Sequence, residues 1–301
     1  RSADRFFLKF SPVIGKIGSY QRLFKSRVLV FAMPLFSMWV LSAVPVYMIF
    51  HGINPKEQPK FEKQARKVEP YQQIHLKIIT LRNDFKKSGL KNVDLIVPPV
   101  FKPWELPVDK HLSFKPPIKI GFFGQFRKEK NLGFFLEAFT KAEFSVPVEL
   151  IVQGATAKPE DGELFEKFAK DYSQYSNISF LHQNLIGVEW QKALLGVDAI
   201  MMPYAAERYR YHWGAMLFTA IGFYKPVLQS PELNPEVLQQ FNVGKAIDLS
   251  SVEAFSRQLE EFIEDLVKNT AVYQQGLDEA NHVYGQDKLI QGILGPGSKI
   301  R

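Results

Sequence analysis

Alternating strand and helix segments between Ile118 and Ser230 constrain the fold of this chain more than any other feature. Short apolar segments alternate there with amphipathic ones. The expected strands are 118–124, 148–154, 178–183, 199–204 and 226–230, and the expected helices are 131–142, 163–175, 188–196 and 213–224. This order is typical of an α/β domain whose parallel sheet is covered by helices on both faces. Ligands of such domains bind at the carboxyl ends of the strands.

A proline-rich segment separates this domain from the residues before it. Residues 97–117 contain six prolines and therefore predict an extended connector. Before it we expect strands at 46–50, 74–81 and 91–99 and helices at 56–67 and 83–90, which is about half of an α/β domain. The predicted organisation is a partial N-terminal Rossmann-like domain over 1–97, a linker over 98–117, a second Rossmann-like domain over 118–285 and a tail over 286–301.

The tail contains Gly-Pro-Gly-Ser at 295–298, which resembles the scar left by tag cleavage and is kept out of the fold prediction. The last three residues, 299–301, could open a first strand. Such a scar normally precedes a natural N-terminus, so its place near the end of the sequence is unusual. An engineered permutation, or a chain with missing segments, would explain both the scar and the partial first domain.

Residues 28–50 form an uncharged stretch of 23 residues, which is long enough for a membrane-spanning helix. Pro34 and Pro45 divide it, however, into two pieces rich in strand-forming residues. Two buried parallel strands joined by a short helix give the same hydropathy. We favour the buried strands and keep the spanning helix as the alternative.

The cysteine, histidine and charge content limits the kinds of site that this chain can form. The chain has no cysteine and six histidines without metal-ligand spacing, so neither thiolate chemistry nor a metal site is expected.

The two parts of the chain differ in charge. Residues 1–117 carry 20 Lys/Arg against 8 Asp/Glu, a net charge of +12, whereas residues 118–301 carry a net charge of −5. The basic part predicts an anionic partner, either a membrane surface, a lipid diphosphate or a nucleic acid. A solvated basic surface is the alternative, and no nucleic-acid-binding signature is present.

Two cations follow the strand that opens the second domain. Gly124 ends the strand region, and Arg127 and Lys130 stand three residues apart in the next loop. Glycine lets a ligand approach the backbone, and fixed cations stabilise the negative charge that develops on a departing diphosphate. Arg127 would offer a planar fork and Lys130 a point charge. The alternative is a solvated charge cluster at a helix entry.

The segment 121–139 resembles the opening of the C-terminal domain in GT4-like glycosyltransferases (group 1), which have the GT-B fold. There too a strand ends in Gly, and an Arg and a Lys follow three residues apart; the family's Gly after the lysine is Asn131 here. The segment 201–230 is similar to a second family segment, in which a helix begins at a Gly after a loop. Its matching positions are Pro203, Tyr204, Gly214, Ala220, Pro226 and Val227.

The resemblance implies a site that binds a nucleotide sugar. It assigns catalytic roles to Lys130, Arg127 and His51, the last because relatives place a histidine after a strand of the first domain. It assigns donor-binding roles to Gly124, Gln125, Gln183, Asn184, Tyr204, Gly214, Ala215 and Thr219. Arg208 and Arg210 are added as donor-binding candidates because they lie in the loop just before Gly214 and could supply positive charge, and Glu207 because it lies in the same loop.

The sequence departs from the family at two further positions. Where many relatives carry glutamates, eight positions apart, this chain has Tyr211 and Thr219. Glu207 is a candidate substitute. The aromatic residues Tyr209, Tyr211 and Trp213 are equally explained by packing.

The expected function is transfer of a sugar, with retention, from a nucleotide sugar to a glycan or lipid-linked acceptor. No cofactor is expected, since the nucleotide sugar is a substrate. The expected place is the cytoplasm, with peripheral binding at the inner membrane face. The alternative is a catalytically silent GT-B subunit that acts as a scaffold. We expect Lys130→Ala to lower turnover with little effect on folding, and Gly214→Val to weaken diphosphate binding more than stability.

Overall fold

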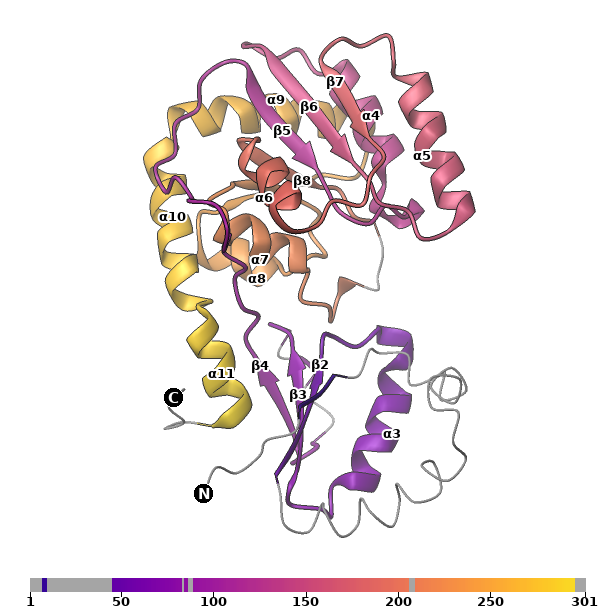
Figure 1. The fold of residues 1–301 in the computed structure, drawn as a ribbon, viewed down its shortest axis with the longest axis vertical. Helices are drawn as coiled ribbons and strands as arrows, with labels where there is room; N and C mark the ends of the chain where they lie inside the picture. Colours follow the sequence, from indigo (N-terminus) through magenta and orange to yellow (C-terminus); the bar gives the residue numbers. More distant parts are fainter. Residues whose placement is uncertain (1–6, 10–44, 83, 86–88, 206–208, 296–301) are drawn as a thin grey trace. The chain divides into compact units, whose positions relative to one another are not determined.

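The computed structural model describes residues 7–9, 45–82, 84–85, 89–205 and 209–295 (Figure 1). The chain divides into two compact units. The first comprises residues 1–98, 208–213 and 287–301, and the second comprises residues 99–207 and 214–286. Each unit is built around a parallel sheet.

The second unit contains a parallel sheet in the order β10-β9-β8-β5-β6-β7. Its strands are β5 (Ile118–Phe122), β6 (Val148–Gln153), β7 (Ile178–Leu181), β8 (Ala199–Met202), β9 (Val227–Gln229) and β10 (Gly244–Ala246). Chain order runs outward from β5 on one side and from β8 on the other, so the order reverses between these two strands. The loops that follow β5 and β8 therefore lie where ligands bind in sheets of this kind.

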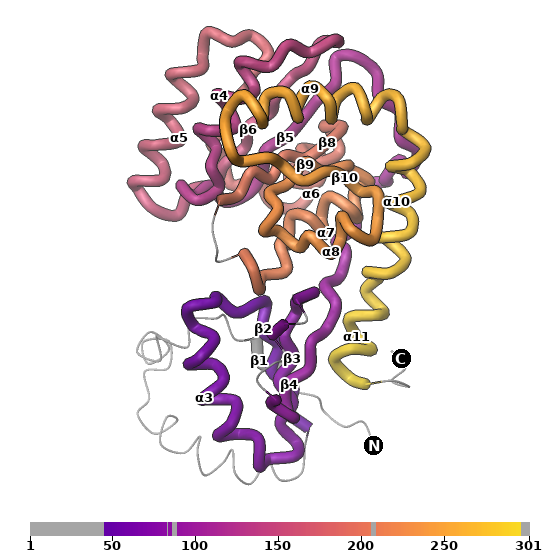
Figure 2. Tube along the Cα trace, turned by 180° about the vertical axis from the view of Figure 1, so that it is seen from behind, coloured from indigo at the N-terminus to yellow at the C-terminus, as the bar shows by residue number. Residues whose placement is uncertain are grey.

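The helices of the second unit are α4 (Leu132–Lys141), α5 (Pro159–Asp171), α6 (Gly187–Leu195), α7 (Ala215–Gly222), α8 (Pro235–Gln240), α9 (Val252–Lys268) and α10 (Thr270–Val283). Helix α4 packs against α9 (Figure 2). In this contact the Phe134 and Phe255 rings stack with centroids 5.9 Å apart. Helix α7 is joined to α10 by Asn281, whose side chain donates to the Ile221 carbonyl over 2.7 Å. The predicted alternation is confirmed as far as β9, and the sequence had assigned no element beyond it.

The first unit contains a parallel sheet in the order β1-β2-β3-β4. Its strands are β1 (Phe7–Lys9), which the sequence did not predict, β2 (Val46–Phe50), β3 (Ile74–Ile79) and β4 (Val93–Ile96). A short 3-10 turn, η1 (Pro55–Glu57), leads into α3 (Gln58–Val68), which covers one face of this sheet. Its core contains Phe50, Phe61, Leu76, Ile78 and Phe85, among others.

The opposite face of the first sheet is more polar and borders α11 (Gln286–Leu294). Side chains alternate along a strand, so His75 and Lys77 point away from the core formed by Leu76 and Ile78. With Tyr47, Asp94 and residues of α11 they line a pocket of about 490 Å³. Burial, and then the charge of Lys77, lower the pKa of His75. Helix α11 thus belongs to the first unit, although the sequence assigned residues 286–301 to a separate tail.

Some predicted segments lie largely outside the described residues. Strand β2 is the second strand predicted for residues 28–50, but residues 28–44 are not described. Of the predicted helix at 83–90, residues 83 and 86–88 are not described, residues 84–85 form a 3-10 turn and residues 89–90 are not helical. The residues proposed to open a first strand, 299–301, also lie outside the described residues. Within the part of the chain that the structure describes, no helix combines the length and apolarity needed to cross a bilayer.

Candidate functional site

Three strand ends of the second unit are tied together by one buried glutamine. The N–H of Gly124 donates to Oε1 of Gln153 over 2.9 Å, and the Gln153 amide group donates to the carbonyl oxygen of Gln183. These residues follow β5, end β6 and follow β7. Gln153 is only 1% exposed, and the sequence analysis missed it. A polar residue directly after the apolar segment 150–152 of this strand was the available signal.

Gly124 has a backbone angle φ of +99°, which side-chain-bearing residues rarely adopt. A Cβ atom at this position would lie 3.3 Å from Nζ of Lys130 and 3.5 Å from Cε of Met216. Met216 belongs to the first turn of α7. The loop after β5, the Lys130 ammonium group and the start of α7 therefore lie together.

Lys130 reaches Gly124 because the chain turns sharply behind it. A 3-10 turn, η3 (Lys128–Lys130), is followed by Asn131 in the left-handed conformation, with φ of 58°, where the family has glycine. Lys130 is 9% exposed, and its Nζ donates to the Phe123 carbonyl over 3.1 Å. Because the stem and the carbonyl bond are part of the packing, we now expect Lys130→Ala to lower stability as well as turnover, a larger effect on folding than the sequence predicted.

Aromatic rings hold the Lys130 ammonium group on two sides. It lies 4.9 Å from the centroid of the Tyr204 ring and 5.7 Å from that of Phe122. Tyr204 follows β8, so this contact joins the two strands between which the sheet order reverses. Tyr204 is 4% exposed, which makes its ring a support for Lys130.

Helix α7 begins at Gly214, whose φ is +57°. The amides of its first turn carry the positive end of the helix dipole; the Leu217 N–H donates to the Gly214 carbonyl over 2.8 Å, whereas the N–H groups of Ala215 and Met216 precede the first bond of the helix. A Cβ at Gly214 would approach Cδ1 of Leu233 to 2.5 Å and Nδ2 of Asn234 to 2.9 Å. Gly214→Val is therefore expected to disturb packing as well as the proposed diphosphate site, so a loss of stability would accompany the predicted loss of binding.

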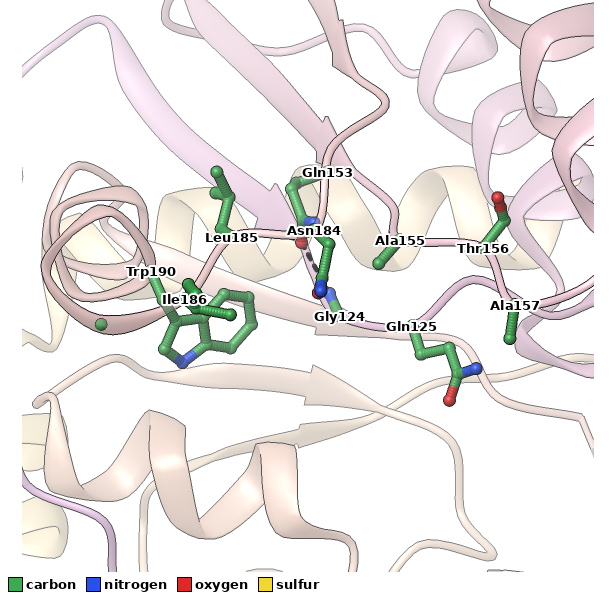
Figure 3. A pocket seen from close by; sticks show the side chains of 11 residues that line it. Gly124, Gln125, Gln153, Ala155, Thr156, Ala157, Asn184, Leu185, Ile186 and Trp190 are labelled. Carbon is green, nitrogen blue, oxygen red and sulfur yellow. Dashed lines mark hydrogen bonds between the residues drawn. The ribbon is translucent and has the colours of Figure 1, made fainter.

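A pocket of about 540 Å³ opens beside Gly124 (Figure 3). It is lined by Gly124, Gln125, Gln153, Ala155, Thr156, Ala157, Asn184, Leu185, Ile186, Gly187 and Trp190. One end is apolar and includes the Trp190 indole, which packs edge-on against Phe123 with centroids 6.0 Å apart. The rest offers amide and hydroxyl groups. Such a site can hold a flat ring at one end and a polar group at the other.

The other predicted residues of this unit have separate positions. Arg127 is half-buried, and its Nη2 donates to Oε1 of Gln125 over 3.0 Å, which orients the guanidinium group at the pocket edge. Asn184 lines the pocket, whereas Gln183 contributes its carbonyl oxygen to the bond with Gln153. Thr219 is 8% exposed and donates to the Ala215 carbonyl over 2.8 Å, so its hydroxyl serves its own helix.

His51 and Arg210 belong to the first unit. The His51 ring packs edge-on against Trp213, with centroids 5.7 Å apart. Arg210 donates to Oδ2 of Asp84 over 2.9 Å, and the Tyr211 hydroxyl donates to the same oxygen over 3.3 Å. The contacts of both residues described here are made within the first unit, and their predicted site roles stay predictions.

The environment of Asp84 favours its charged form. Burial alone would raise the pKa of Asp84, but the hydrogen bond and charge of Arg210, together with the Tyr211 hydroxyl, outweigh it. The net effect holds the pKa below its ordinary value. The remaining predicted residues, Glu207 and Arg208, lie outside the described residues. Among the described residues, no group of three His, Asp or Glu side chains is placed to hold a metal ion.

No known family model and no curated protein matches this chain. Solved structures do. WaaG, a glycosyltransferase involved in lipopolysaccharide biosynthesis, superimposes with a TM-score of 0.56 at 17% identity, over 88% of this chain and 82% of WaaG. HepE from Anabaena in complex with UDP gives a TM-score of 0.59 at 12% identity, over 81% of this chain and 68% of HepE.

A variant of TarM from S. aureus, in complex with fondaparinux, alpha-GlcNAc-glycerol and UDP, gives a TM-score of 0.62 at 13% identity. That match covers 91% of this chain but only 52% of TarM. The chain has the GT-B fold that these glycosyltransferases share, with one Rossmann-like sheet in each unit.

Proposed function

We propose that this chain is a glycosyltransferase whose second unit binds a nucleotide sugar. The observation that carries the proposal is the meeting of Gly124, Lys130 and the first turn of α7 beside a 540 Å³ pocket. This meeting point lies at the carboxyl ends of β5 and β8, where the strand order reverses. A fold shared with glycosyltransferases supports the proposal but does not carry it, since one fold serves many functions.

The proposed chemistry assigns each part of a nucleotide sugar to one part of the site. The base lies at the Trp190 end of the pocket, and the diphosphate lies at Gly124, where the chain has no side chain to exclude it. Lys130 and the first two amides of α7, those of Ala215 and Met216, then face the phosphate oxygens. As the bond between sugar and diphosphate breaks, negative charge grows on the leaving diphosphate, and fixed positive groups stabilise that transition state.

Arg127 is assigned a supporting role in the same step. Its bond to Gln125 keeps the guanidinium group at the pocket edge, from which it can bind phosphate oxygens through two N–H groups. His51 has no assigned step, since it belongs to the first unit and its printed ring contact is with Trp213.

The acceptor, in this proposal, is a glycan or a lipid-linked sugar. WaaG is described as acting in lipopolysaccharide biosynthesis, and the TarM variant was solved with the sugar ligand fondaparinux. The basic character of residues 1–117 is compatible with an anionic acceptor or membrane surface. Retention of the sugar's configuration, and a cytoplasmic location at the inner membrane face, follow from the family resemblance and belong to the proposal.

A second candidate function is nucleotide-sugar binding without transfer. Its support is the absence of carboxylates at two positions where many relatives have glutamates. The Tyr211 side chain packs against Phe85 and bonds Asp84, and the Thr219 hydroxyl bonds its own helix. Neither side chain replaces a carboxylate next to the donor.

A panel of nucleotide sugars distinguishes these functions. Melting temperatures would be measured with UDP, GDP, CDP, ADP and dTDP sugars, because a ligand that binds only the folded state stabilises it by about 2.7 kcal/mol at 100 times Kd. Release of nucleoside diphosphate would be followed for each ligand that stabilises the protein. Stabilisation with release supports the transferase, and stabilisation without release under any acceptor tested supports the silent binder. A chain that none of these ligands stabilises contradicts both.

A further inference from the structure

One buried side chain joins the two loops that border the centre of the pocket. The Gln153 amide accepts from the Gly124 N–H over 2.9 Å (Figure 3), and it donates to the Gln183 carbonyl. Gly124 belongs to the loop after β5. Residues 184–187 and Trp190, which follow Gln183 in the chain, line the pocket as far as its apolar end. Gln153 therefore connects the proposed diphosphate end of the pocket with the loop that leads to its proposed base end.

The two partners of Gln153 determine which way its amide faces. A backbone N–H can only donate and a backbone carbonyl can only accept, so Oε1 must face Gly124 and Nε2 must face Gln183. None of these groups titrates, so the arrangement is independent of pH. The Gln153 side chain is 1% exposed, which shields the connection from exchange with bulk water.

Backbone hydrogen bonds hold the two loops unequally. The Gly124 carbonyl accepts from the Ala155 N–H over 3.2 Å, so the loop after β5 is also bound through the backbone to the chain after β6. On the other side, a backbone bond from the end of β6 reaches the Leu181 carbonyl, two residues before Gln183. The Gln153 amide thus supplies a direct bond that places Gln183 relative to Gly124.

We propose that Gln153 is a positioning residue that fixes the spacing between the Gly124 loop, which receives the diphosphate, and the loop 183–187, which leads to the base. This inference rests on the proposed function, since it needs a nucleotide across the pocket. The second phosphate of a nucleotide adds affinity only if the Gly124 loop stands at the right distance from the bound base. A spacing that is set before binding strengthens the whole nucleotide, because less free energy is lost in ordering the loops.

A purely structural role for Gln153 predicts a different result. In either case, removal of the amide takes a partner from one backbone donor and one backbone acceptor, so the melting temperature falls. A role in folding alone would leave the affinity of the folded molecules unchanged or would weaken every nucleotide by the same factor. The proposed role makes the loss larger for a diphosphate, which reaches both ends of the pocket, than for the matching monophosphate.

The test compares nucleoside monophosphates with diphosphates by calorimetry on the full chain. The pairs UMP/UDP, GMP/GDP, CMP/CDP and AMP/ADP are measured on the wild type, and the pair with the tightest diphosphate is used for the variants. The quantity compared is the Kd of the monophosphate divided by the Kd of the diphosphate. Gln153→Met keeps the length of the side chain but loses both hydrogen bonds. We expect it to lower this ratio about tenfold, the value of one hydrogen bond to a charged phosphate.

A second variant and a control separate spacing from stability. Gln153→Asn keeps an amide for one partner but is one methylene shorter, so it should fold more readily than Gln153→Met and still lower the ratio. Asn281→Leu is the matched control, because Asn281 is 6% exposed and its amide also donates to two backbone carbonyls, away from the residues that line the pocket. It should lower the melting temperature and leave the ratio at the wild-type value.

The outcomes separate this inference from the proposed function. A wild type that binds none of the nucleotides overturns both. A wild type that binds a pair while both Gln153 variants keep its ratio overturns the role of Gln153 alone, and so does equal weakening of monophosphate and diphosphate. A ratio that falls as much in Asn281→Leu would be a general effect of lost stability and would also overturn it. A ratio that falls in the Gln153 variants and not in the control supports the inference.

Discussion

Each unit has a glycine with positive φ just after one of its parallel strands, but the atoms that surround the two glycines differ. Gly52 follows β2 with φ of +120°, and Gly124 follows β5 with φ of +99°. A Cβ at Gly52 would approach the Tyr211 carbonyl oxygen to 2.5 Å and Cα of His212 to 2.7 Å, so the space beside this glycine is filled by the protein's own backbone. At Gly124 the nearest atoms are side-chain ends at 3.3 Å and 3.5 Å, and a pocket begins there.

A left-handed glycine at the end of a parallel strand is therefore not by itself a sign of a ligand site. In the first unit it lets Gly52 form a bridge with His212, which anchors residues 209–213 beside β2. The aromatic side chains of this segment, Tyr209, Tyr211 and Trp213, are less than 10% exposed and belong to packing. In the second unit the same backbone geometry leaves an approach to Lys130 and α7. What surrounds the glycine decides its use.

Among the predicted variants, removal of the Lys130 charge beside Gly124 should have the largest effect on catalysis. Lys130→Met keeps most of the stem's volume between the Tyr204 and Phe122 rings but removes the ammonium group. We expect kcat to fall by about two to three orders of magnitude, the usual effect of one preorganised electrostatic group. Lys130→Ala should show the same loss and, in addition, a lower melting temperature, because the buried stem is removed.

Lys128→Met is the matched control, since Lys128 lies in the same turn and is exposed. Steady-state kinetics and thermal melts would be recorded for all three variants with the donor found in the nucleotide-sugar panel. Near-normal turnover in Lys130→Met would remove Lys130 from the reaction and would leave the two glycine loops without a functional difference.

Alanine at each glycine compares the loops directly. Gly52→Ala forces an unfavourable φ and an overlap with backbone atoms, so we expect a loss of about 3 kcal/mol in the free energy of unfolding. Gly124→Ala has the unfavourable φ but only side-chain neighbours, so we expect about 1 to 2 kcal/mol. Urea denaturation measures both values.

Nucleotide binding should show the reverse order. Gly124→Ala places a methyl group where the proposed diphosphate approaches, and its affinity should fall more than that of Gly52→Ala among the molecules that remain folded. If Gly52→Ala lost the affinity and Gly124→Ala kept it, the proposed donor site in the second unit would be wrong.

The sequence predicted the second-unit sheet well because its strands are short apolar segments bounded by glycine and proline. It misplaced α5, predicted at 163–175, since the apolar residues begin late in a helix that starts at Pro159. Proline at the first position and acidic residues in the first turn were the signals for this start. Helix α9 was also predictable: Ser251 caps it by accepting from the Ala254 N–H, and apolar residues follow at helical spacing.

The candidate site was predictable only where its residues are close in sequence. Gly124, Arg127 and Lys130 form a visible motif, and their proximity follows from a single turn. Gln153 acts across three strand ends, so no spacing in the sequence indicates its contacts. The assignment of Arg210 to the donor rested on sequence proximity to Gly214, whereas the backbone between them passes from one unit to the other.

Replacement of the Arg127 fork should have a moderate effect. Arg127→Lys keeps the charge but loses the planar pair of N–H groups and the bond to Gln125 that orients it. We expect kcat/KM to fall about tenfold, the value of one lost charge-assisted hydrogen bond. Gln125→Ala should reproduce part of this loss if orientation is the reason. Steady-state kinetics of both variants test this prediction. An unchanged kcat/KM in Arg127→Lys would mean that Arg127 belongs to a solvated charge cluster and has no role in the reaction.

The smallest effect, a small change in melting temperature, is expected when the ion pair between Arg210 and Asp84 in the first unit is removed. Arg210 and the Tyr211 hydroxyl hold the pKa of Asp84 below its ordinary value, despite the opposing effect of burial. A carboxyl group whose pKa is lower in the folded state stabilises that state above its unfolded pKa, and this contribution is lost as the pH falls through the folded pKa. Asp84→Asn should therefore lower the melting temperature slightly at pH 7, and the difference from wild type should shrink in acid. Thermal melts between pH 7 and pH 3 measure this difference.

Since the Arg210 side chain is 47% exposed, high salt should reduce the same difference in melting temperature. A difference that is independent of both pH and salt would mean that Asp84 acts through packing and that its charge does not help to hold residues 209–213.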